Sequence, residues 1–132
     1  NIQVFQKYLE LTHDDLPVSK LREENLLLRP VTQMALAHAA LFARRHGIEW
    51  VDVVTMLNSA NWSFNNDLWY NILVIGSANK KMITGKESIR SAGAVITYLI
   101  MGDQMSRAEI EDVRQIIRNA RNDETAELPS RI

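Results

Sequence analysis

The hydrophobic residues of this 132-residue chain repeat with a helical period over most of its length. The longest regular stretch covers residues 30–46, where Pro30 suits the first turn of a helix and Gly47 is typical of its end. Residues 34–43 are apolar on almost every side apart from His38, and a helix without a polar face is usually buried on several sides. The sequence therefore predicts a mainly α fold, a helical bundle around a central buried helix at about 30–46.

Other segments share this period and predict the remaining helices of the bundle. They cover residues 2–11, 50–57 and 86–101. Within the last of these, Gly93 either permits a close crossing with another helix or is merely tolerated. Ser106 and Glu109 have the spacing of a capping box, and the helix that they begin is expected to end at about Asn122.

One stretch has strand-like rather than helical character. Residues 70–75 are rich in β-branched and aromatic side chains, residues 76–79 have turn composition, and residues 80–84 can return as a second strand. The expected exception to the helical fold is thus one short β-hairpin at about 70–84.

These elements predict a single helical domain over residues 1–122, followed by a flexible tail over residues 123–132 that contains Pro129. Because the chain starts at Asn1 inside a helical pattern, we expect it to be the C-terminal fragment of a longer protein.

Composition excludes several classes of protein and site. No apolar run approaches the roughly 20 residues that span a bilayer, so we expect no membrane partner. The absence of cysteine excludes disulfides, cysteine-ligated zinc and thiol catalysis, and it fits a cytoplasmic location. Phosphate-binding glycine loops, nucleophile elbows and zinc-protease motifs are all absent from the sequence. We therefore expect no catalytic residue, no cofactor and no metal in this chain.

His38 is the polar interruption of the apolar helix, and it has two interpretations. It is either a partly buried histidine with one hydrogen bond, or a metal-binding or acid–base residue. His13 and His46 lie at no ligand spacing from it, which favours the first interpretation.

Positive charge is concentrated in the second half of a chain whose net charge is −1. Residues 78–121 carry eight basic and five acidic side chains, an excess of +3 that can form a modest basic surface. Two clusters are candidates for contact with DNA phosphates: Lys80, Lys81, Lys86 and Arg90 at the hairpin end, and Arg114, Arg118 and Arg121 on the last helix. The alternative for the helix is an intrahelical ion-pair ladder, because Glu111 precedes Arg114 by three residues.

Tryptophans provide a second candidate site. Trp62 and Trp69 stand seven residues apart in the segment WSFNNDLW, where they either frame a ligand pocket or base-stacking platform, or plug the edge of a core. Trp50 begins the preceding helix and joins them as a candidate for a protein interface.

The order of short motifs resembles the C-terminal part of the DndB family, bacterial DGQHR-domain proteins of the DNA sulfur modification system. The first matching block comprises Lys20–Glu23, Asn25–Val31 and Ala35–Ala37. The second comprises Leu57, Asn61–Ser63, Leu68–Trp69, Lys81–Ile83, Tyr98–Gly102 and Met105–Glu109. The Asp-Gly-Gln-His-Arg motif itself is absent, so the resemblance is to the helical portion and not to the ParB-like N-terminal part. It implies a DNA-associated role in regulating the modification genes or assisting phosphorothioation.

Three hypotheses follow for function. The first is a non-enzymatic, DNA-associated regulatory or accessory domain, whose two basic clusters contact phosphates. The second is a protein-interaction or structural module that supports a missing N-terminal DGQHR domain or binds other DNA-modification proteins through Trp50, Trp62 and Trp69. The third is an enzyme fragment whose catalytic centre lies in the missing part.

Overall fold

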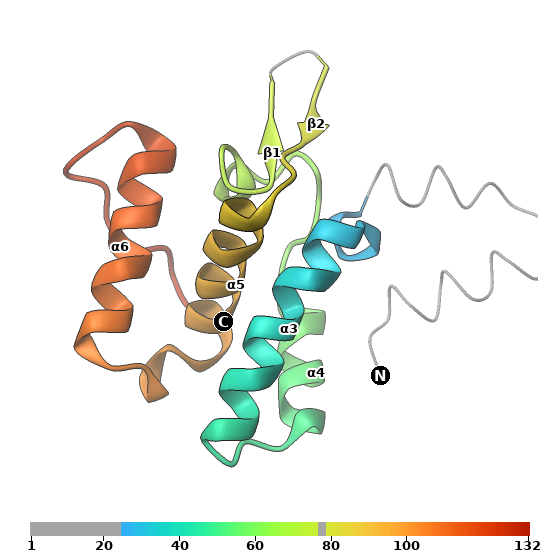
Figure 1. Cartoon of the computed structure of the whole chain (residues 1–132), viewed down its shortest axis with the longest axis vertical. Helices are drawn as coiled ribbons and strands as arrows, with labels where there is room; N and C mark the ends of the chain where they lie inside the picture. The colour runs from blue at the N-terminus through green and yellow to red at the C-terminus, as the bar shows by residue number, and fades with distance from the viewer. Residues whose placement is uncertain (1–24, 77–78) are drawn as a thin grey trace, which may run out of the picture.

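The computed structural model describes residues 25–76 and 79–132, which fold into helices with one small antiparallel hairpin (Figure 1). The longer helices are α3 (Pro30–Arg45), α4 (Trp50–Ser59), α5 (Lys86–Met101) and α6 (Arg107–Arg121). Short 3-10 turns occur at η1 (Leu26–Leu28), η2 (Asp67–Trp69) and η3 (Gly102–Gln104), and the strands are β1 (Val74–Ile75) and β2 (Lys81–Met82). The predicted mainly α fold with a short hairpin is confirmed. The helix expected over residues 2–11 lies outside the described residues.

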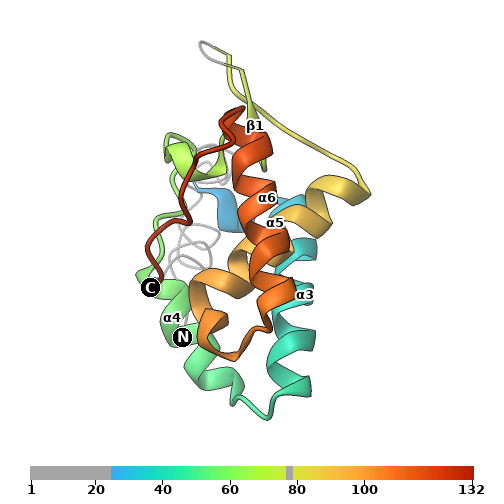
Figure 2. The same cartoon turned by 90° about the vertical axis from the view of Figure 1, so that its left-hand side faces the viewer.

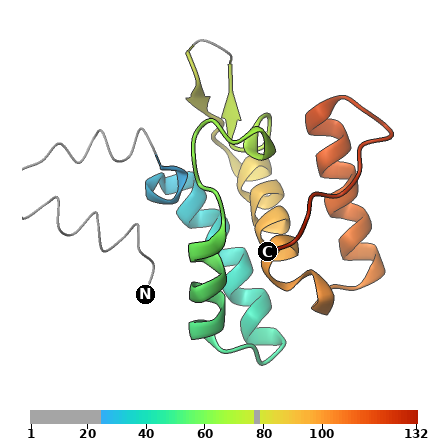
Figure 3. The same cartoon turned by 180° about the vertical axis from the view of Figure 1, so that it is seen from behind.

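Helix α5 runs through the middle of the described structure, with α3 on one side and α6 on the other (Figures 1 and 3). Ten of its sixteen residues are buried, including Val95 and Ile96. Its most extensive contact is with α3, and it also packs against α4 and η3. The central helix of this bundle is therefore α5.

Helix α3 has the ends that the sequence predicts, but it is not the buried centre. Pro30 occupies its first turn, and Gly47 follows it with a φ of 65°. Ala35 and Ala39 face the core, whereas Met34 and Leu41 on the opposite face are 55% and 51% exposed. The expectation of burial on several sides is corrected, because no other described element covers this outer apolar face.

Gly93 lies at a close crossing of α3 and α5. A Cβ atom placed on Gly93 would lie 2.7 Å from Cβ of His38, well inside normal contact distance. The glycine is therefore required for the close crossing and is not merely tolerated.

The hairpin is shorter than predicted, with Val74 opposite Met82 and Ile75 opposite Lys81. Its base is tied to α5 by the Ser88 hydroxyl, which donates a hydrogen bond to the Ile72 carbonyl over 2.7 Å. This contact fixes the hairpin at the N-terminal end of α5.

The C-terminal segment differs from the expected flexible tail. Helix α6 begins with the predicted capping box, and residues 123–132 then return beside α5 and α6 (Figure 2). Arg118 Nε donates to the Ala126 carbonyl over 3.1 Å, and the Ile132 backbone N–H donates to the Leu99 carbonyl over 3.0 Å. An ion pair between Arg131 and Asp103 adds a third attachment. The tail is packed because Ala126 is buried and these three contacts attach the tail to α6, α5 and η3.

Candidate functional site

A cleft of about 370 Å³ lies between α3, α5 and α6. The α3 wall carries His38, Phe42 and Arg45, which are spaced by four and three residues and so share one side of the helix. The α6 wall carries the carboxylates of Glu109 and Asp112. Helix α3 thus builds one cleft together with α5 and α6, which follow it in the chain after about 40 residues.

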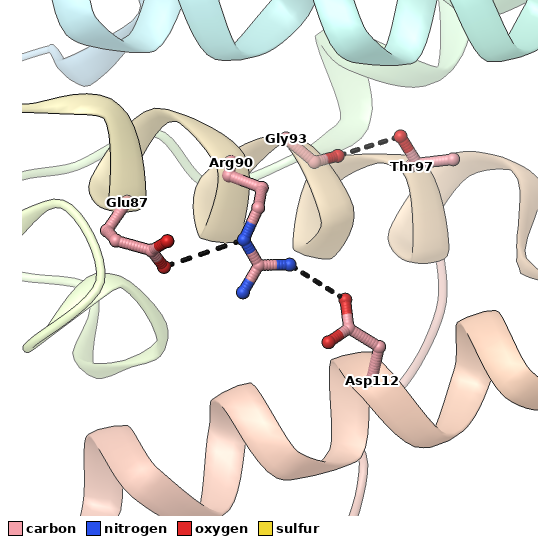
Figure 4. Close-up of polar contacts among 5 residues, drawn as sticks. All are labelled: Glu87, Arg90, Gly93, Thr97 and Asp112. Atoms are coloured by element: carbon pink, nitrogen blue, oxygen red, sulfur yellow. Dashed lines mark hydrogen bonds and ion pairs between the residues drawn. The ribbon is translucent and has the colours of Figure 1, made fainter.

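Small residues of α5 form the floor of this cleft. Gly93 and Ala94 line it, and Thr97 completes the floor with its hydroxyl donating to the Gly93 carbonyl over 2.7 Å. This bond satisfies the buried hydroxyl within α5, as Figure 4 shows. The floor consequently has little polar character of its own.

Arg90 lines the cleft and links α5 to α6 (Figure 4). Its guanidinium donates to Asp112 over 3.1 Å and forms a second ion pair with Glu87, at 3.5 Å. Because these side chains are about half or more exposed, the pairs contribute little to stability, but they orient Asp112.

Glu109 stands at the other end of the α6 wall and is held in place by the capping box. The pKa of its carboxyl is lowered, chiefly because the carboxylate accepts a hydrogen bond from the Ser106 backbone N–H. Burial is the next largest effect and raises the pKa, whereas the Ser106 hydroxyl and the nearby charges of His46 and Arg45 lower it further. Glu109 is therefore an anion facing the positive side chains of α3.

His38 is exposed at the cleft wall, so the expectation of a partly buried histidine is corrected. Among the described residues, no group of three or more histidine, cysteine or acidic side chains is placed to hold a metal ion. The sequence did not identify the cleft, since its walls come from three separate helices. The sequence feature that could have indicated the cleft was the placement of His38, Phe42 and Arg45 on one side of an otherwise apolar helix.

Parts of the two predicted basic clusters lie on elements at one end of the molecule, the hairpin end, which comprises the hairpin, the start of α5 and the end of α6 (Figure 1). Asn71 Nδ2 donates to the Ala120 carbonyl over 2.9 Å and joins the hairpin base to the last turn of α6. Lys80, Lys81 and Lys86 therefore share this end with Arg118 and Arg121.

Several of these basic side chains already have partners. Arg114 forms an ion pair with Glu111, as the ladder alternative predicted, and Arg90 is paired across α5 and α6. Lys80 Nζ donates to Asn65 over 2.9 Å. Three side chains are exposed and take part in no ion pair within the described residues: Lys81, Lys86 and Arg121.

The tryptophans are divided between core and surface. Trp62 and Trp69 are buried and stack with ring centroids 5.3 Å apart, and their indole N–H groups donate to the carbonyls of Leu57 and Asn61. Neither can offer its ring to a partner, so the interface prediction is corrected for both. Trp50 is 49% exposed, so its ring is accessible to a protein partner.

No helix in the described part of the chain is both long and apolar enough to cross a membrane. No protein-family model matches the chain, and neither a curated protein nor a solved structure matches it. The resemblance to the DndB family stays a prediction.

Proposed function

We propose that this chain is a non-enzymatic, DNA-associated regulatory or accessory domain whose hairpin end contacts the phosphate backbone. The observation that carries the proposal is the hydrogen bond from Asn71 to the Ala120 carbonyl, because it brings the elements that carry Lys81, Lys86 and Arg121 to one end of the molecule. The resemblance to the DndB family adds the biological setting, regulation of or assistance to DNA phosphorothioation.

Lys81, Lys86 and Arg121 are the main phosphate-binding side chains in this proposal. They are exposed, and no described ion pair competes for them. Lys80 keeps donors beyond its bond to Asn65, since an ammonium group has three. Asp123 lies close to Arg118 and Arg121, so part of the positive charge there is offset. These side chains would position the protein on the duplex without reading its sequence.

The test is a salt titration of duplex binding, followed by fluorescence anisotropy. Replacing Lys81, Lys86 and Arg121 together by glutamine should weaken binding to every duplex by a similar factor. It should also flatten the plot of log K against log salt by about 0.9 for each phosphate that the variant no longer neutralises.

The matched control is Arg44→Gln, an exposed arginine in the last turn of α3 and distant from the hairpin (Figure 1). It should leave affinity and slope unchanged. Equal slopes for the wild type and the triple variant would exclude the hairpin end as a phosphate-binding surface. No duplex binding by the wild type at about 50 mM salt would contradict the proposal as a whole.

A second candidate function, a protein-interaction module, is favoured by the exposed apolar side chains. Met34 and Leu41 on α3, and Trp50 and Val51 at the start of α4, are each about half exposed or more. The partner proposed here is a DGQHR domain of the same protein or another DNA-modification protein. A complex that survives high salt and is lost in Leu41→Ser would support this function, whereas a complex that dissociates on raising salt would contradict it.

A further inference from the structure

We propose that the cleft between α3, α5 and α6 binds a small zwitterion with an apolar body, of the chemical class of an aromatic amino acid. This proposal is independent of DNA binding, because the cleft does not include Lys81, Lys86 or Arg121.

The size and floor of the cleft suit such a molecule. Its volume of about 370 Å³ lies within the usual range for small-molecule sites, roughly 300–1,000 Å³. Phe42, Gly93 and Ala94 provide apolar surface, and Met105 adds a flexible thioether side chain at the rim. The Phe42 ring is itself stacked on His46, with 4.0 Å between ring centroids, which restricts its orientation.

The two walls carry opposite charges. Arg45 on α3 presents a guanidinium, and Glu109 and Asp112 on α6 present carboxylates. In the described structure no ion pair joins α3 to α6, although charges of both signs border the same cleft. The positive and negative walls are therefore held apart and can each accept a counter-charge.

A ligand with one charge would satisfy one wall and leave the other unpaired. The lining includes two arginines and two carboxylates, so it favours neither net anions nor net cations. A zwitterion matches both walls at once. Its carboxylate would pair with Arg45, whose planar guanidinium suits bidentate contact. Its ammonium would pair with the carboxylate oxygens that the Ser106 N–H and Arg90 leave free on Glu109 and Asp112.

The rigid framework around these groups supports a binding role. The Ser106 capping bonds hold Glu109, the Arg90 guanidinium holds Asp112, and the close crossing with His38 fixes Gly93 in the floor. Charged groups that are already oriented lose less conformational entropy when a ligand binds.

The experiment is an NMR titration of the ¹⁵N-labelled chain with three probes: L-phenylalanine, 2-phenylethylamine and 3-phenylpropionate. We expect saturable shifts at the Gly93, Ala94 and Thr97 amides with L-phenylalanine. Each singly charged analogue should bind about fivefold more weakly, the ratio for removing one exposed charge interaction of about 1 kcal/mol.

Two variants test the walls. Arg45→Gln and Glu109→Gln should each weaken L-phenylalanine binding by about the same factor. Glutamine at position 109 also preserves the capping box, so the start of α6 stays intact. Arg44→Gln is the matched control, because Arg44 is the neighbouring arginine and does not line the cleft. The proposal is overturned by the absence of saturable shifts, by equal affinity for all three probes, or by unchanged affinity in both wall variants.

Discussion

Helices α3 and α5 are alike in sequence and differ in position. Each has sixteen residues, a mostly apolar middle and small residues that permit close approach. Yet α5 buries ten of its residues, whereas α3 buries five and leaves Met34 and Leu41 half exposed. Composition therefore did not decide which helix lies at the centre.

The difference comes from the elements that surround each helix. Helix α5 lies between α3 and α6, and the C-terminal segment reaches its last turn through the bond from Ile132 to Leu99. Helix α3 packs on α5 and, less extensively, on α4 and η1, so one apolar face has no described neighbour. An apolar stripe on a helix indicates that burial of that face is favourable, but it does not determine which element packs against the face.

The largest expected effect comes from deleting a large side chain from each helix. Ile96→Ala on α5 should lower the free energy of unfolding by about 2–5 kcal/mol, because Ile96 is 1% exposed and a cavity would remain. Leu41→Ala on α3 should change it by about 0.5 kcal/mol or less, since half of that side chain is already in water. Urea denaturation measures both. Equal losses of unfolding free energy in the two variants would contradict the central position of α5.

A second test compares the two faces of α3 itself. Ala39→Leu should destabilise the fold by about 1–3 kcal/mol through overpacking, because Ala39 is 1% exposed. Ala37→Leu, two residues away on the exposed face, should shift stability by no more than about 0.5 kcal/mol. Thermal unfolding measures the stability of both variants. A large loss of stability in Ala37→Leu would show that another part of the protein packs against the outer face of α3.

The smallest effect concerns α6, whose start depends on local bonds and not on burial. Ser106→Ala should cost about 1 kcal/mol at neutral pH through loss of the N-cap bond to the Glu109 N–H. Because the hydroxyl itself does not titrate, most of this loss should persist in acid.

Glu109→Ala extends the same test to pH. The pKa of Glu109 is lowered in the folded state, so its carboxylate stabilises the fold above the ordinary value of 4.5. That contribution is lost as pH falls through the lowered pKa. The difference in melting temperature between wild type and Glu109→Ala should therefore shrink below pH 4.5, while most of the difference for Ser106→Ala persists. A constant difference for Glu109→Ala would contradict the assigned role of its charge.

The sequence predicted less of the candidate site than of the fold. The basic residues were identifiable, but their partners were not: Arg90 pairs with Asp112 across two helices, and Lys80 bonds to Asn65. Charge counting cannot separate a free cation from a paired one when the partner is far away in the chain. The ion pair between Arg114 and Glu111 could be anticipated, because both lie on one helix at a spacing of three.

The features that followed directly from the sequence are local ones. Pro30 and Gly47 set the ends of α3, and Ser106 with Glu109 set the start of α6, because these signals act through bonds within a few residues. Packing between distant segments placed α5 at the centre and returned the tail to Leu99. It also brought Arg45 and Glu109 to the border of one cleft. These features depend on which helices pack together, and the periodicity of each helix leaves that choice open.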